Sequence, residues 1–73
     1  MPTTPAEIAI AAIWQRLLGI SSVHTTDNFF ELGGHSVLAM RAIAQIEAEL
    51  HVRIPPRRFI FETLAQIAAT ATG

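Results

Sequence analysis

Ser36 is the residue of this sequence that is best placed to take part in chemistry. It follows the pair Gly33-Gly34 and His35, and the apolar pattern becomes helical at Ser36 itself. The first turn of a helix carries free backbone N–H groups and the positive end of the helix dipole, and both favour a negative charge. A phosphate ester on Ser36 would therefore lie where the backbone stabilises it.

The common catalytic motifs do not fit the residues around Ser36. A nucleophile elbow requires glycine two residues after the serine, where this chain has Leu38. A Walker A loop requires a lysine, which the sequence lacks, and the glycines do not form a Rossmann fingerprint. His35 is adjacent to Ser36 and should point away from it, and the three histidines (His24, His35 and His51) are too scattered for a metal site. We therefore expect no catalysis by this chain alone.

Length and composition indicate one small domain over residues 1–73. The chain has no cysteine, so it needs no oxidising compartment, and a cytoplasmic monomer is expected. Its net charge is −1, with five arginines and no lysine, which is a poor electrostatic match for nucleic acid.

The N-terminus lacks the basic region of a signal peptide, and the longest apolar run, residues 8–14, is too short to span a membrane. Whether the chain is free-standing or belongs to a longer protein stays open.

Apolar periodicity predicts an all-α fold, a small four-helix bundle with three longer helices and one short one. The expected helices lie at about 5–18, 36–50, 57–61 and 63–71. Thr4 and Glu7 can form a capping box at the first helix, Gly19 is a natural left-handed stop, and Thr63 can cap the last helix with Gln66.

Side-chain spacing also predicts which residues face the core. Trp14 belongs to the inward stripe of the first helix, and either Phe59 or Phe61 should point inward from the short one. The loop between the first two helices should pack through its own apolar residues, and Asp27 is expected to cap a helical turn at 28–31. The expected inward residues of the remaining helices are Leu38, Ala39, Ala42, Ile43, Ile46, Leu50, Leu64, Ile67, Ala68 and Ala71.

The outer face of the second helix carries a possible contact surface. Val37 and Met40 are apolar where a solvated helix would carry charge, and they lie one turn apart beside Ser36 and Arg41. The glycine pair would let another protein's backbone approach the hydroxyl. The two arginines at 57–58 either extend this surface or form a solvated basic patch, and the sequence favours neither.

The segment 27–36, DNFFELGGHS, resembles the attachment motif of carrier proteins, and most of all the peptidyl carrier (thiolation) domains of non-ribosomal peptide synthetases. The resemblance continues through AIWQRLLG at 12–19, residues 52–55 and FETLA at 61–65, so it covers nearly the whole chain. His35 favours the peptidyl type over fatty-acid carriers, which usually have aspartate there.

The resemblance implies a function for this chain. Ser36 would carry 4'-phosphopantetheine, added from coenzyme A by a phosphopantetheinyl transferase, and the thiol of the arm would hold aminoacyl or peptidyl groups as thioesters. Adenylation, condensation and thioesterase domains would be the partners. Gly34, His35, Val37, Met40 and Arg41 would take part in their recognition.

Three other interpretations remain at this point. The chain could be an acyl or aryl carrier of a polyketide or siderophore pathway. It could be a small helical DNA-binding module, although five dispersed arginines neutralise few phosphates. It could also be a plain interaction bundle in which Ser36 serves only as a helix N-cap.

Overall fold

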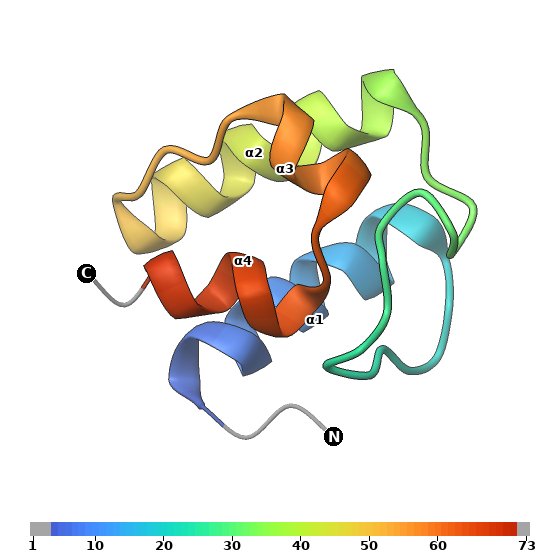
Figure 1. Cartoon of the computed structure of the whole chain (residues 1–73), viewed down its shortest axis with the longest axis horizontal. Helices are drawn as coiled ribbons and strands as arrows, with labels where there is room; N and C mark the ends of the chain where they lie inside the picture. The colour runs from blue at the N-terminus through green and yellow to red at the C-terminus, as the bar shows by residue number, and fades with distance from the viewer. Residues whose placement is uncertain (1–3, 72–73) are drawn as a thin grey trace.

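The computed structural model describes residues 4–71, with side chains as far as Thr70. This part of the chain forms the helices α1 (Pro5–Leu18), α2 (Ser36–Leu50), α3 (Pro56–Phe61) and α4 (Leu64–Ala71). In Figure 1, α2 runs along one side of the molecule, α1 and α4 lie on the other, and α3 lies over α2. The loop of residues 19–35 runs from the end of α1 to the start of α2 and encloses one end of the bundle. Within residues 4–71 no helix is long and apolar enough to cross a membrane.

Helix bounds follow the capping residues that were expected to set them. Thr4 and Glu7 form a capping box at α1, which ends at Gly19 with a φ of 67°. Thr63 and Gln66 bond to each other's backbone N–H groups at the start of α4. The short helix begins at Pro56, one residue earlier than the periodicity indicated, because proline is favoured at the first helical position.

Three aromatic rings form the centre of the core, one each from α1, the loop and α3. The ring centroid of Trp14 lies 5.1 Å from that of Phe29 and 5.7 Å from that of Phe59, and these two lie 5.2 Å from each other. All three side chains are fully buried, so each removes a large apolar area from water. The alternative between Phe59 and Phe61 is thereby resolved in favour of Phe59.

Aliphatic side chains surround the aromatic rings on the inner faces of the helices. Those expected to face inward are buried or half-buried, except that the side chain of Ala71 lies outside the described residues. The buried aliphatic residues are Ala6, Ile10, Ala11, Ile13, Val23, Ala39, Ala42, Ile43, Ile46, Ile54, Leu64, Ile67 and Ala68.

Backbone hydrogen bonds attach the long loop to the junction between α3 and α4. Leu64 donates its N–H to the carbonyl of Asp27 at 2.9 Å, and Ala65 donates to the carbonyl of Thr25 at 3.0 Å. An isolated antiparallel bridge joins Asn28 to Thr63. These bonds, together with the buried Phe29, fix the segment that leads to Ser36.

The expectation that Asp27 caps a helical turn at 28–31 is wrong. A turn does follow, over residues 29–33, with the N–H of Leu32 bonded to the carbonyl of Asn28 at 3.1 Å, but the Asp27 carboxylate accepts a bond from the N–H of His24 instead of capping it. Asn28 is the residue that caps this turn, since its Oδ1 accepts from the N–H groups of Phe30 and Glu31. The two neighbours differ because only the Asn28 side chain points into the protein.

Candidate phosphopantetheine attachment site

Ser36 is the first residue of α2 and is exposed to solvent. The residue before it, His35, is the N-cap, with extended backbone (φ −148°, ψ 177°) and no side-chain cap bond. The interpretation of Ser36 as a helix N-cap is therefore wrong. Within residues 4–71 its hydroxyl has no hydrogen-bond partner, so it is available to another molecule.

The start of α2 also lacks a negative charge to balance its free N–H groups. No acidic residue lies in the first turn, and the His35 side chain accepts no bond from it. By contrast, the first turns of α1 and α4 are closed by capping boxes. The start of α2 is thus suited to an anion attached at or beside Ser36.

The two glycines before His35 serve different purposes. Gly33 has a φ of 104°, which a residue with a side chain rarely adopts. Gly34 is constrained by packing, because a β-carbon there would lie 2.5 Å from the ring of Phe29 and 2.8 Å from its carbonyl oxygen. The glycines were expected to make room for another protein, and the structure gives them a role inside this one.

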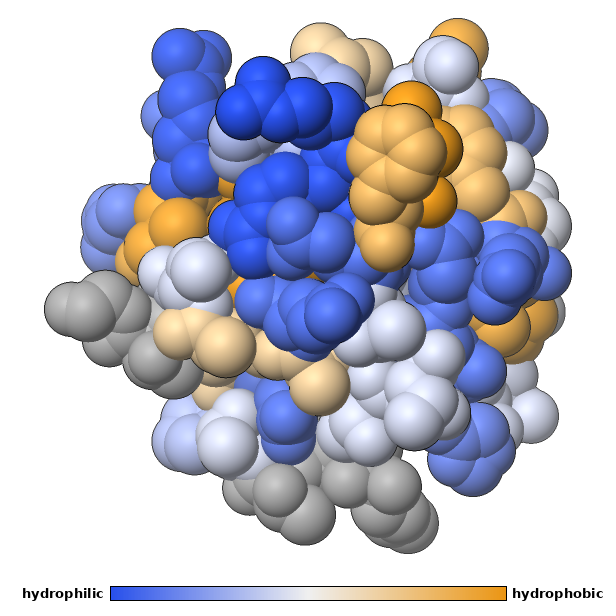
Figure 2. Space-filling model, in the orientation of Figure 1, coloured by the Kyte–Doolittle hydropathy of each residue, from blue (hydrophilic) through white to orange (hydrophobic). Residues whose placement is uncertain are grey.

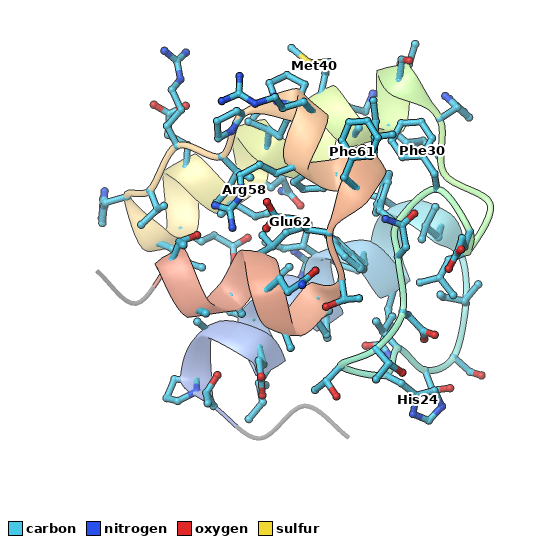
Figure 3. All side chains as sticks on the ribbon, viewed as in Figure 1. His24, Phe30, Met40, Arg58, Phe61 and Glu62 are labelled. Carbon is cyan, nitrogen blue, oxygen red and sulfur yellow. The ribbon has the colours of Figure 1, made fainter. Side chains whose placement is uncertain are left out.

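Four large apolar side chains of α2 and α3 are exposed, and two of them, Val37 and Met40, follow Ser36 closely in α2. Val37 is 60% exposed, Met40 is 56% exposed, Ile60 is 51% exposed and Phe61 is 80% exposed. We call these four residues the α2–α3 surface. Figure 3 shows Met40 and Phe61 on the same side of the molecule, with Phe30 of the loop next to Phe61, and Figure 2 shows apolar side chains on this face.

Ile60 and Phe61 were not among the contact residues that the sequence indicated. A helix of six residues offers too little periodicity to assign its faces, since both of its phenylalanines look like core residues. The useful signal was the spacing of Phe59 and Phe61, because residues two apart on a helix point to nearly opposite sides and only one of them can face the core. Arg41, which was expected at the surface, is exposed on α2.

Arg58 does not extend the contact surface. Its Nε lies 2.9 Å from Glu62 Oε2 and its Nη2 lies 2.6 Å from Glu62 Oε1, and it also donates to the Thr70 hydroxyl and the Gln66 carbonyl. This bidentate pairing raises the pKa of Arg58 and lowers the pKa of Glu62, chiefly through the side-chain hydrogen bonds. Arg58 therefore joins α3 to α4, and only Arg57 of the two arginines is exposed.

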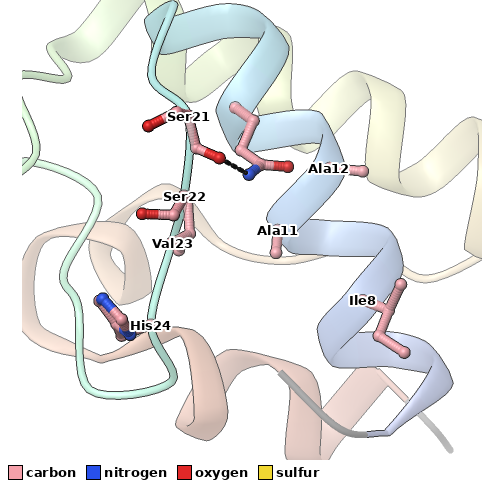
Figure 4. A pocket seen from close by; sticks show the side chains of 8 residues that line it. Ile8, Ala11, Ala12, Ser21, Ser22, Val23 and His24 are labelled. Carbon is pink, nitrogen blue, oxygen red and sulfur yellow. Dashed lines mark hydrogen bonds between the residues drawn. The ribbon is translucent and has the colours of Figure 1, made fainter. Parts of the chain in front are cut away.

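A groove of about 350 Å³ lies on another part of the molecule, between α1 and the loop (Figure 4). Its lining includes Ile8, Ala11 and Val23, with Ser21, Ser22 and His24 along the loop. None of its lining residues belongs to the segment 27–41, so the groove is separate from Ser36. No group of three potential metal ligands occurs in the part of the chain that the structure describes.

Comparison with known proteins assigns the chain to a family. Residues 9–71 match the family described as phosphopantetheine attachment site. The chain belongs to this family. The matched residues include the whole segment 27–41, and the free hydroxyl at the start of α2 is consistent with a covalent attachment there.

The relatives of this carrier domain are segments of peptide synthetases. It is 44% identical over 62 residues to gramicidin S synthase 2 of Brevibacillus brevis, covering 85% of this chain and 1% of the relative. It is 46% identical over 70 residues to surfactin synthase subunit 2 of Bacillus subtilis (strain 168), covering 93% of this chain and 2% of the relative. The chain therefore spans a very small part of the curated relatives that it matches.

The fold also matches a solved peptidyl carrier protein. That protein was determined in complex with the phosphopantetheine transferase Sfp and coenzyme A, and it aligns with a TM-score of 0.90 at 38% identity. The alignment covers 97% of this chain and 94% of that one. The expected all-α carrier fold, the peptidyl carrier type and the use of 4'-phosphopantetheine are thereby confirmed.

Proposed function

We propose that Ser36 is the attachment site of 4'-phosphopantetheine and that residues 1–73 act as one peptidyl carrier unit of a non-ribosomal peptide synthetase. The observation that carries the proposal is the exposed hydroxyl of Ser36, without a partner among residues 4–71, at the first position of α2. It lies inside the stretch that matches the phosphopantetheine attachment family.

The residues at the start of α2 fit the phosphate of the group. The first turn has unpaired N–H groups, no side-chain cap and no carboxylate that would repel a phosphate. When attached, the group supplies a thiol on a long arm, which holds acyl groups as thioesters. The chain itself would contribute effective concentration, by tethering an intermediate near each partner's site, rather than acid or base catalysis.

The α2–α3 surface and Arg41 are the proposed contacts for partners. The transferase would use them first, followed by adenylation, condensation or thioesterase domains. Four large apolar side chains remain exposed there although each could release free energy on burial. Gly34 and His35 would act mainly by holding Ser36 in place. The monomeric state and the cytoplasmic location expected from the sequence stay predictions.

Two alternatives lose support from the described residues. Arg16, Arg53 and Arg58 each have a glutamate partner within 3.9 Å, which offsets part of the positive charge that a nucleic acid would require. The interaction-bundle hypothesis required Ser36 to be a cap, and the cap position belongs to His35. A carrier role explains both the free hydroxyl of Ser36 and the exposed apolar side chains of α2 and α3.

Mass spectrometry tests the proposal directly. The protein is incubated with coenzyme A and a promiscuous phosphopantetheinyl transferase, and the mass of the intact protein is measured. The wild type should gain one phosphopantetheinyl group, and Ser36→Ala should gain none. Ser22→Ala is the matched control, because Ser22 is another exposed serine, and it should be modified like the wild type. No added mass on the wild type, or addition that survives Ser36→Ala, would overturn the proposal.

A further inference from the structure

Asn28 is the one polar residue with a buried side chain in the described part of the protein, and it is only 9% exposed. Its Nδ2 donates to three carbonyl oxygens at the end of α3, those of Phe59 at 3.1 Å, Ile60 at 3.1 Å and Glu62 at 2.9 Å. On its other side, Oδ1 accepts from the N–H of Phe30 at 2.9 Å and of Glu31 at 3.2 Å. Carbonyls on one side and N–H groups on the other define the orientation of the amide.

The end of α3 depends on such a partner for its carbonyl groups. The helix has only six residues, too few to be stable by itself, and its C-cap residue Glu62 is extended rather than left-handed. The usual glycine-type closure, in which backbone N–H groups bond to the last carbonyls, is thus absent at this end. Asn28 supplies the missing donors from another segment of the chain.

The same side chain organises the approach to Ser36. The turns that Oδ1 closes lead directly to Gly34, whose N–H bonds to the carbonyl of Phe29 at 3.1 Å. From there, His35 and α2 follow without further residues between them. One amide group therefore connects the end of α3, which carries Phe61, to the segment that presents Ser36.

We propose that Asn28 is a positioning residue for partner recognition, which fixes Phe61 relative to Ser36 by joining the end of α3 to the loop. This inference rests on the proposed function, since it assumes that partner proteins bind to the α2–α3 surface. Burial of Phe59 holds the middle of α3, and the Arg58–Glu62 pair holds its outer side against α4. The Phe59 ring also contacts Phe29 of the loop, but neither this packing nor the Arg58–Glu62 pair bonds to the last carbonyl groups of α3, as the Asn28 amide does.

Asn28→Asp is the sharpest variant, because it keeps the shape and the acceptor of the side chain. The bonds from Phe30 and Glu31 can persist, while a carboxylate oxygen replaces the donor that faces three carbonyls. The matched control is Asp27→Asn, an equally small change at a neighbouring side chain that bonds to the N–H of His24. Steady-state kinetics of phosphopantetheine transfer to each variant then separate KM from kcat.

Asn28→Asp should raise the KM of the transferase for the carrier about tenfold, the ratio that corresponds to 1.4 kcal/mol, and leave kcat nearly unchanged. Asp27→Asn should leave both constants at the wild-type values. Phe61→Ala should raise KM in the wild type but add little in the Asn28→Asp background, because both changes act on the same contact. An unchanged KM, or effects of the two changes that add fully, would overturn the inference.

Hydrogen exchange in the wild-type protein provides a test that needs no variant. The side-chain amide protons of Asn28 should exchange far more slowly than those of an exposed asparagine, since they are buried and bonded. Rapid exchange would overturn the inference even if Asn28→Asp failed to fold. Failure of the proposed function would look different, because the wild type would then gain no phosphopantetheine on Ser36 at all.

Discussion

The ring of Phe29 occupies the space that any side chain at Gly34 would need. A β-carbon on Gly34 would lie 2.5 Å from two ring atoms of Phe29, which is itself fully buried between Trp14 and Phe59. The ring cannot move aside without disturbing both neighbours. The backbone leading to Ser36 is thus held directly against the centre of the core.

Gly34→Ala should therefore destabilise the protein by about 1–3 kcal/mol, the usual cost of forcing extra atoms into a packed core. Urea unfolding measures the free energy of unfolding. Gly19→Ala is the matched control, since no atom lies within 4 Å of its β-carbon position and only its φ of 67° is unfavourable. The control should lose about 1 kcal/mol. A Gly34→Ala protein as stable as the wild type would show that the contact with Phe29 imposes no constraint.

Ser36→Ala should change the free energy of unfolding of the unmodified protein by less than about 0.5 kcal/mol. The reason is that the hydroxyl is exposed and has no hydrogen-bond partner in residues 4–71. Thr4→Ala provides the comparison, because the Thr4 hydroxyl accepts from the N–H of Glu7 at 3.1 Å and its loss should cost about 1 kcal/mol. Equal losses in the two variants would restore a capping role to Ser36.

Phe61→Ala should impair recognition by the transferase without changing stability, whereas Phe59→Ala should lower the stability of the protein. Phe61 is 80% exposed, so its removal should leave unfolding by urea almost unchanged and raise the KM of the transferase. Phe59 is fully buried, and its removal should cost about 3–5 kcal/mol. A Phe61→Ala variant with a wild-type KM would remove Phe61 from the contact surface.

Glu62→Gln should change how stability depends on pH. The bonds from Arg58 lower the pKa of Glu62 in the folded protein, so the carboxylate contributes stability above its unfolded pKa of about 4.3. This contribution is lost as the pH falls through the lower, folded pKa. The difference in free energy of unfolding between wild type and Glu62→Gln should therefore be constant near neutral pH and shrink in acid. Glu31→Gln is the control for the loss of one negative charge. The prediction would be contradicted if the difference in free energy of unfolding between wild type and Glu62→Gln stayed constant in acid.

The sequence predicted the helices and most of the core because local signals and tertiary packing agree in them. Thr4 with Glu7, Gly19, and Thr63 with Gln66 are capping residues whose chemistry is local, so the ends of α1 and the start of α4 could be read directly. The position of Ser36 at the start of α2 followed from the change to helical periodicity. Its role followed from resemblance rather than from periodicity.

Features that depend on distant contacts could not be read in the same way. Asn28 resembles any turn residue in the sequence, and its importance comes from carbonyls 31 to 34 residues away. Arg58 looked like part of a basic patch with Arg57, because nothing local indicates that Glu62, Gln66 and Thr70 surround it. Gly34 suggested open space, whereas the neighbouring ring of Phe29 fills it.

Trp14 is the single tryptophan of the chain, and the chain has no tyrosine. Its indole is fully buried and contacts rings from both the loop and α3. The near-ultraviolet emission of the protein should therefore come from one fluorophore at the junction of three segments. The unlabelled protein consequently contains its own optical probe, which should shift to longer wavelengths when water reaches the ring.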